Sequence, residues 1–435
     1  MTVGARWSHA VVIVTVAAAI RLVFAALVPP LPDEAYYWTW SRHMSLGFFD
    51  HPPGIAMLIR AGGMLLSPFG RSATPIGVRF GAVIAGWIAA VATAAIARRV
   101  LDDEAAVRAA IIMSVLPLAA AGLILATPDA PVLAAAAVGL YCVVRAIEPE
   151  PSGGQARRTI QFAALHRVSS VGWWIAAGVV LGLAFSSKYT SIFLPVGVVA
   201  AIVIRPSLRA RLREPGPYAA CVLATLVFAP VLWWNAHHGW VSFVYQVRHG
   251  LAAPHGSVLR AAWRHEGDFF GGQAALASPI VFVLLGIAVA RGLSRRASNI
   301  RFVLAVVSAT SFAFFVYSAL RQRVEPNWPA LAYVPAIALL AATPLSPRGE
   351  RWRRGGLWLA VAMSAAIYVQ ALIPILPIAG PKDPIGRAFG WRELTAAADS
   401  SALAASRASR TTTWLAADRY QEASVMALYD PLHPA

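Results

Sequence analysis

The sequence carries little charge. Of its 435 residues, 13% are charged and 58% are hydrophobic, whereas soluble domains carry roughly 25% charged residues. The apolar residues gather in uncharged runs that match the thickness of a bilayer and recur along most of the chain. This composition excludes a water-soluble globular protein and predicts an all-α polytopic membrane protein.

Cysteine is also scarce. Cys142 and Cys221 both lie in apolar runs, and the chain has neither a Cys-x-x-Cys pair nor a Cys/His spacing typical of zinc sites. We interpret both residues as small packing residues. The inverted internal repeats found in many transporters are not visible either.

Acidic residues are few, with 20 Asp and Glu against 37 Lys and Arg and a formal net charge of +17. In a soluble protein this balance would suggest nucleic acid as a partner, but here the arginine clusters fall in every second loop between apolar runs. Cytoplasmic loops collect arginine in this way, so we expect a cytoplasmic N-terminus, an external C-terminus and no nucleic-acid partner. About eleven helices are predicted, over residues 10–28, 76–97, 107–125, 130–147, 171–187, 190–204, 217–234, 276–291, 302–319, 329–343 and 356–378.

The opposite, extracytoplasmic loops contain the segments that could carry chemistry: 32–53, 127–129, 187–189, 234–268 and 321–328. Threading the helices through a membrane brings these segments to one face, so we expect a site built from several loops. We divide the chain into a transmembrane domain, 1–380, and a short external segment, 381–435. In that segment Thr411 to Ala417 alternates like a strand and Gln421 to Leu428 resembles a helix, and 148–170 is interpreted as a linker.

The first external segment begins with adjacent carboxylates, Asp33 and Glu34, followed by an aromatic run that includes Tyr36 and Tyr37. Such a pair at the membrane surface could meet both a lipid headgroup and a water-soluble substrate. The alternative is an ordinary interfacial belt of aromatic residues with incidental carboxylates.

Three further segments hold isolated charges. Asp129 follows Pro128 and could cap the next helix. Lys188 breaks the positive-inside trend. It could pair with an anion such as a lipid phosphate, or its side chain could extend to the headgroup region by snorkelling. Arg321 and Arg323 could bind phosphate oxygens or form a solvated loop.

The histidines of the loop 235–275, together with Glu266 and Asp268, could hold a divalent cation, but their spacing fits no particular metal site and ordinary loop polarity is the favoured interpretation. Taken together, external carboxylates and external cations suit transfer from a lipid-phosphate donor, because a carboxylate can deprotonate an acceptor hydroxyl and a cation can stabilise the departing phosphate.

The ordered motifs along the chain resemble a known family. They read Asp-Glu-Ala-Tyr-Tyr-Trp at 33–38, Phe-Asp-His-Pro-Pro at 49–53, Thr-Pro-Asp at 127–129, Ser-Lys-Tyr at 187–189, Glu-Pro-Asn-Trp at 325–328 and Gly-Trp-Arg-Glu-Leu at 390–394. This set is similar to the polytopic glycosyltransferases of the C-type fold (GT-C), specifically family 39 and the related lipid A aminoarabinose transferases.

The resemblance implies a GT-C transmembrane helical bundle and inverting transfer of a sugar from a polyprenyl-phosphate carrier at the outer face of a bacterial inner membrane. It implies that Asp33 is the general base, beside Glu34, and that Asp129 orients the acceptor or assists Asp33.

Asp50 and His51 fall where the lipid A transferases use a Glu-Lys pair for a metal and the carrier phosphate. With histidine in place of that lysine, the phosphate role would pass to Lys188 and Arg323, aided by His51 and Arg321, and a metal role for Asp50 stays open. We expect Tyr36, Tyr37, Asp50, Glu325, Asn327 and Trp328 to contact the substrate or acceptor. The expected partners are the lipid-linked donor, membrane lipids and a lipid, glycan or protein acceptor.

A transporter or flippase of a lipid-linked or anionic solute is the alternative function, but transporters usually place polar sites near the bilayer midplane.

Overall fold

The computed structural model describes residues 6–70, 73–148, 160–250, 258–373, 375–378, 383 and 385–430, with the side chains of 160–169, 249 and 258–261 left aside. Across these residues the chain is helical and contains no strand. The predicted all-α bundle is thereby confirmed.

Within the described part of the chain, six helices are long and apolar enough to cross a membrane: α1 (Trp7–Leu27), α4 (Pro75–Val100), α7 (Asp129–Ile147), α10 (Pro215–His237), α14 (Asn299–Ala319) and α16 (Pro347–Leu372). Two bent pairs could raise that number to eight. One joins α9 (Phe193–Ile204), preceded by a 3₁₀ turn at Tyr189–Ile192, to Pro206–Arg213, and the other joins α12 (Val258–Ala277) to α13 (Pro279–Gly292). Shorter apolar helices are α3 (Gly54–Leu66), the apolar half of α8 (Ile160–Phe185) and α15 (Ala330–Ala341).

The predicted number of eleven spans is therefore not confirmed, and proline explains part of the difference. The predicted span 107–125 is divided into α5 (Asp103–Val115) and α6 (Pro117–Gly122), because Pro117 has no N–H for the carbonyl of Met113. The buried guanidinium of Arg21 in α1 replaces that donor, since its Nη2 lies 3.0 Å from the Met113 oxygen and 3.2 Å from the Ser114 oxygen.

The external side is more ordered than the sequence predicted. The segment after α1 forms α2 (Pro32–Arg42), and the predicted loop 235–275 contains α11 (Val241–Gly250) and most of α12. Two helices, α17 (Trp391–Ser409) and α18 (Tyr420–Tyr429), follow in the C-terminal segment, so the helix predicted at 421–428 is confirmed. The strand predicted at 411–417 is wrong: the segment is extended but exposed, and it has no neighbouring strand with which to pair.

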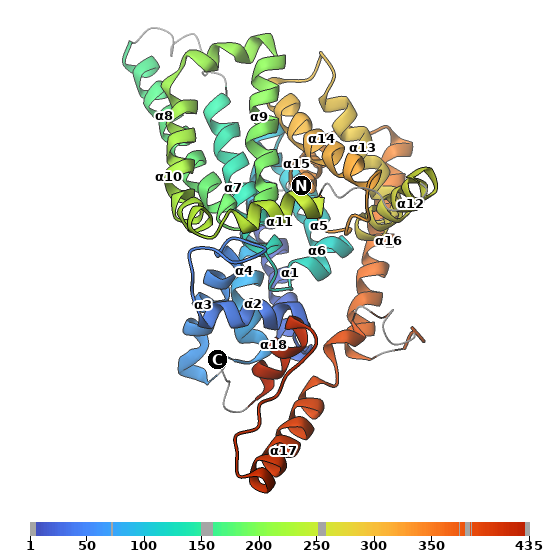
Figure 1. Ribbon diagram of the computed structural model, residues 1–435. Coiled ribbons are helices and arrows are strands. Elements are labelled where there is room, and N and C mark those ends of the chain that lie inside the picture. The colour runs from blue at the N-terminus through green and yellow to red at the C-terminus, as the bar shows by residue number, and fades with distance from the viewer. Residues whose placement is uncertain are drawn as a thin grey trace.

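Figure 1 shows how these elements position a site. Helices α7, α8 and α10 stand side by side, and α9 packs on α14. Helix α11 crosses their lower ends in this view, with α2 beyond it and α18 packed on α2. The site described next lies where the upright helices meet the crossing ones.

Candidate active site

A cavity of about 860 Å³ is lined by residues of the upright helices α8, α9, α10 and α14 and of the crossing helices α2 and α11. All five external segments singled out in the sequence contribute to it, which confirms that they meet. Their polar contributions are Asp33, Tyr37, Asp50, His51, Thr127, Asp129, Lys188, Tyr189, Gln246 and Asn327.

The rest of the lining is apolar and largely aromatic. It comes from α8, α9, α10, α11 and α14 and includes Phe185, Phe193, Phe228, Phe243, Phe314 and Phe315, with Trp328 at the end of the 321–328 loop. A cavity with a charged end and an apolar body suits an amphiphile with a polar headgroup and a hydrocarbon chain.

The best-defined polar contact in the cavity joins Asp129 to Lys188. Lys188 Nζ donates to Asp129 Oδ1 over 2.6 Å, Asn327 Nδ2 donates to Asp129 Oδ2 over 2.8 Å, and the charged pair is buried. Asp129 does not cap α7, because the capping position is Pro128 and no side chain caps that helix. The anion that Lys188 requires is therefore first of all Asp129, and a carrier phosphate would have to share the ammonium group with it.

Three carboxylates lie around the phenol of Tyr37, which is buried in α2. Burial, followed by the negative charges of Asp50, Asp33 and Asp129, raises the pKa of Tyr37 well above its usual value. Tyr37 is therefore un-ionised at neutral pH and can donate its hydroxyl hydrogen. Asp33 lies next to it on α2, is half-buried and lines the cavity.

Helix α11 holds the loop that carries Asp50. Gln246 Nε2 donates to the Asp50 carbonyl oxygen over 2.6 Å, and Ser242 Oγ donates to the Phe48 carbonyl oxygen over 2.6 Å. Burial raises the pKa of Asp50 to about 6, and the nearby Asp33 adds to this, while a hydrogen bond from Tyr36 opposes it. Tyr36 thus reaches the site through Asp50, although it does not itself line the cavity.

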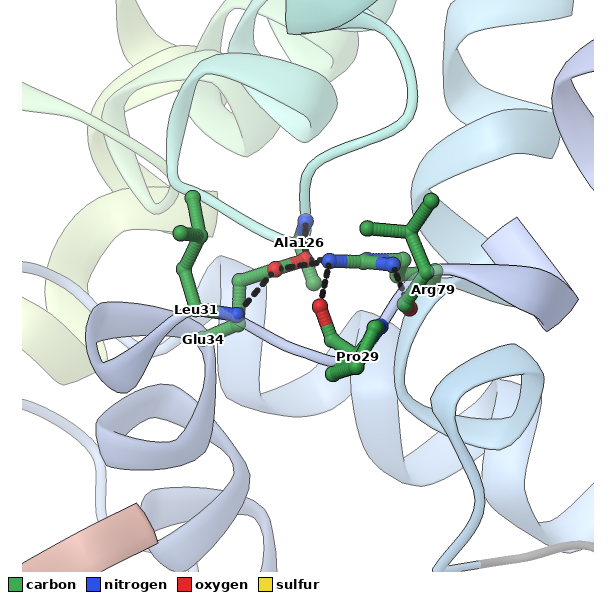
Figure 2. Close-up of polar contacts among 6 residues, drawn as sticks. Pro29, Leu31, Glu34, Arg79 and Ala126 are labelled. Carbon is green, nitrogen blue, oxygen red and sulfur yellow. Dashed lines mark hydrogen bonds and ion pairs between the residues drawn. The ribbon is translucent and has the colours of Figure 1, made fainter. Parts of the chain in front are cut away.

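Glu34 does not lie in the cavity. It is 0% exposed and its two oxygens accept four hydrogen bonds, shown in Figure 2: from Arg79 Nε (2.7 Å) and Nη2 (2.5 Å), and from the backbone N–H groups of Leu31 (2.9 Å) and Ala126 (2.8 Å). A carboxylate so fully bonded cannot take a proton from a substrate. The catalytic role expected for Glu34 is therefore corrected to a structural one.

The same contacts tie together the segments that carry Asp33 and Asp129. Arg79 also donates to the carbonyl oxygens of Val28 (2.6 Å) and Pro29 (3.0 Å), so one buried ion pair links the end of α1, the start of α2, helix α4 and the loop before Asp129. Sequence reasoning missed Arg79. The available signal was an isolated arginine inside an apolar span, which usually has a dedicated partner.

The charged residues of the 321–328 loop also lie away from the cavity. Arg323 and Glu325 have side chains that are 71% and 49% exposed and face each other at 3.5 Å. Arg321 packs on Tyr317, with Nη1 3.2 Å from the Tyr317 hydroxyl. The expected phosphate-binding role of the two arginines and the substrate contact of Glu325 have no support in this geometry, because none of the three side chains lines the cavity.

Asn327 and Trp328 of that loop do reach the cavity, and a second buried network holds them there. Gln273 Nε2 of α12 donates to the Pro326 carbonyl oxygen over 2.9 Å, and the Tyr333 hydroxyl donates to Gln273 Oε1 over 2.8 Å. Both Gln273 and Tyr333 are buried. The sequence offered no clear signal for Gln273, since it lay in a segment interpreted as a polar loop.

A metal role for Asp50 was left open by the sequence. Among the residues that the structure describes, no group of three or more His, Cys, Asp or Glu side chains is placed to hold a metal ion. Of the histidines in 235–275, His237 and His238 bond through Nδ1 to the carbonyl oxygens of Trp233 and Trp234.

Comparisons with known proteins agree with this fold. The family model described as dolichyl-phosphate-mannose-protein mannosyltransferase matches residues 50–155 and 159–234. The lipid A galacturonosyltransferase RgtD of Rhizobium johnstonii is 27% identical over 307 residues, which cover 71% of this chain and 59% of that protein. The chain thus spans less than two thirds of the length of this curated relative.

Among solved structures, ArnT from Cupriavidus metallidurans bound to undecaprenyl phosphate has the same fold, with a TM-score of 0.63 and 17% identity over 96% of this chain and 74% of that one. The archaeal oligosaccharyltransferase AglB from Archaeoglobus fulgidus matches with a TM-score of 0.50 and 11% identity over 94% of this chain and 60% of that one. These matches and the multiple apolar helices show a multi-pass membrane protein that has the fold of ArnT. In sequence the chain is similar to the dolichyl-phosphate-mannose-protein mannosyltransferase family model over those residues and to a lipid A galacturonosyltransferase.

Proposed function

We propose that the protein transfers a sugar from a polyprenyl-phosphate carrier to a hydroxyl group of an acceptor, with inversion at the anomeric carbon. The observation that carries this proposal is the amphiphilic cavity, which has Lys188 and the carboxylates at one end and a long apolar body between α8, α9, α10 and α14. The apolar body would take the prenyl chain, and the charged end would take the phosphate and the sugar.

The residues divide the chemistry as follows. Asp33 accepts the proton of the acceptor hydroxyl, whose oxygen attacks the anomeric carbon. The bond between that carbon and the phosphate oxygen breaks, the electron pair leaves with the phosphate, and Lys188 stabilises the added negative charge. Asp129, which is held by Lys188 and Asn327, orients the acceptor. Tyr37 donates a hydrogen bond to one of the three carboxylates around it.

For the acceptor we propose a phosphorylated glycolipid of the lipid A class, because a relative that is 27% identical over 307 residues is named for that acceptor. We propose the inner membrane of a bacterium as the location, with the cavity facing the periplasm, in line with the arginine-rich alternate loops. No described contact favours the transporter alternative over transfer.

The test of the general base is Asp33→Asn in the full chain, reconstituted in vesicles with polyprenyl-phosphate sugars and lipid A and assayed by mass spectrometry. Transfer should fall at least about 100-fold, because general-base catalysis supplies about that much. Asp268→Asn, an exposed carboxylate outside the cavity lining, is the matched control and should retain activity. Transfer by Asp33→Asn at the wild-type rate would refute the assignment, and solute uptake without transfer by the wild type would favour a transporter.

The test of the phosphate site uses Lys188. Removing the lysine alone would leave Asp129 buried without its cation, so the informative variant is the double replacement Lys188→Gln with Asp129→Asn, compared with Asp129→Asn alone. Affinity for undecaprenyl phosphate should fall about 10- to 100-fold between the two, the equivalent of one charge-assisted hydrogen bond. Equal affinities would remove Lys188 from the phosphate site.

A further inference from the structure

The C-terminal segment is anchored on the helix that carries the proposed general base. In α18, Val425 and Leu428 are 0% and 4% exposed and pack in one apolar cluster with Ala35 and Trp38 of α2. A cation–π contact of Arg392 over Tyr429 ties α17 to α18. The segment is therefore a fixed part of the structure on the side of α2 seen below it in Figure 1.

This anchoring brings Tyr420, the first residue of α18, to the edge of the site. Its ring lies 4.4 Å from the ring of Tyr36, centroid to centroid, with the planes at 52°. The hydroxyl of Tyr36 is hydrogen-bonded to Asp50, which lines the cavity. Tyr420 is therefore one aromatic ring away from a carboxylate of the site.

The electrostatic surroundings of Tyr420 agree with that position. Burial, followed by the nearby carboxylates of Asp50 and Asp33, raises the pKa of Tyr420 to about 12. Its phenol is un-ionised at neutral pH, and the residue as a whole is 53% exposed. It can therefore still donate a hydrogen bond to an incoming molecule.

Tyr420 does not belong to the proposed donor cavity. The described residues that line the cavity include Asp33 and Tyr37 of α2 but none from α17 or α18. The two sides of α2 thus face different environments: one faces the cavity with its apolar body, and the other is covered by α18 and its half-exposed tyrosine. A second substrate that must reach the carboxylates without displacing the prenyl chain would approach past Tyr420, whose ring contacts Tyr36, which in turn is hydrogen-bonded to Asp50.

We propose that Tyr420 is an acceptor-positioning residue, which stacks its ring on a sugar of the acceptor headgroup and donates its hydroxyl to it at the edge of the site. This inference rests on the proposed transferase function. An aromatic face with a polar tip is suited to a carbohydrate ring, whose C–H groups pack on the ring while its hydroxyl groups accept the hydrogen bond. The C-terminal segment would then select the acceptor, while the transmembrane cavity selects the donor.

The experiment compares Tyr420→Ala and Tyr420→Phe in the full chain. Each is expressed in a strain that lacks the wild-type gene, and mass spectrometry measures the envelope glycolipid or glycan whose loss defines that strain. The same proteins are purified and titrated with undecaprenyl phosphate. The matched control is Tyr218→Ala, a tyrosine of α10 that is 58% exposed and lies outside the lining of the cavity.

We expect Tyr420→Ala to lower formation of the product about tenfold, which corresponds to the loss of one aromatic contact and one hydrogen bond. Tyr420→Phe should recover part of the loss because it keeps the ring, and undecaprenyl phosphate should bind all variants as it binds wild type. Full product with Tyr420→Ala would overturn the inference, as would a loss of carrier binding equal to the loss of product. If removal of the gene changes no envelope product and the wild type transfers nothing in vitro, it is the proposed function that fails instead.

Discussion

The buried pair of Glu34 and Arg79 supports a quantitative prediction. Both side chains are almost completely buried, with exposures of 0% and 1%. Replacing Arg79 with Leu removes two charge-assisted hydrogen bonds to Glu34 and leaves a buried carboxylate with only the N–H groups of Leu31 and Ala126. Breaking such a pair from one side costs about 3–5 kcal/mol, because the remaining charge keeps its desolvation penalty and loses its partner.

The assay is the free energy of unfolding of purified protein in mixed micelles, titrated with denaturing detergent. Arg79→Leu should lose about 3–5 kcal/mol. The double variant Glu34→Leu with Arg79→Leu should lose less than Arg79→Leu alone, because it buries no unpaired charge. The matched control is Arg323→Leu, which breaks the exposed pair with Glu325 and should cost no more than about 1 kcal/mol.

Two results would refute this reasoning. If Arg79→Leu cost no more than Arg323→Leu, the buried pair would not hold the segments together. If the double variant lost more stability than Arg79→Leu, the destabilisation would come from lost packing rather than from an unpaired charge. A further consequence concerns transfer: because Ala126 and Leu31 flank the segments of Asp129 and Asp33, Arg79→Leu should also lower kcat in the fraction that remains folded.

Three more predictions concern single contacts. Folding raises the pKa of Asp50 from 3.8 to about 6, so the contribution of this group to stability is complete below pH 3.8 and is lost as the pH rises through 6. Asp50→Asn should abolish this loss of roughly 3 kcal/mol. The prediction is contradicted if the stabilities of the wild type and the variant change by the same amount between pH 4 and 7. Arg21→Leu should destabilise the protein by about 1–3 kcal/mol. The loss should be smaller in a Pro117→Ala background, where the N–H of residue 117 can again donate to the Met113 carbonyl oxygen. Equal losses in the two backgrounds would show that Arg21 does not replace this N–H. Gly54→Ala would place a Cβ atom 2.6 Å from Ser187 Oγ and 2.8 Å from the Ser186 oxygen, so thermal stability and undecaprenyl phosphate affinity should both fall, whereas Gly172→Ala, with nothing within 4 Å, should change neither.

Part of the fold could be predicted from the sequence alone. Apolar periodicity and arginine placement predicted the long spans, because burial in a bilayer acts on every residue of a helix and leaves a strong local pattern. The same reasoning did not predict the interruption of a run at Pro117. It also missed helices α2, α11 and α17, which lie outside the longest apolar runs and are stabilised by packing rather than by a long apolar pattern.

Part of the site could likewise be predicted from the sequence, and part could not. Residue types and motif order predicted that Asp33, Asp129, Lys188 and Asn327 would belong to it, and the structure places all four in the lining of one cavity. The motif order could not distinguish Glu34 from Asp33, since the two are neighbours with the same chemistry. On a helix, adjacent residues point about 100° apart, so one carboxylate faces the cavity while the other faces Arg79.

The sequence by itself determined that this protein spans a membrane several times and brings a small set of charged residues to one face, because hydrophobicity and charge act locally along the chain. Only the tertiary structure decided which of those charges are paired with each other and which line a cavity. Partners such as Arg79 and Glu34, or Asp129 and Lys188, lie 45 and 59 residues apart, and pairing over such separations depends on how the helices pack rather than on any local pattern.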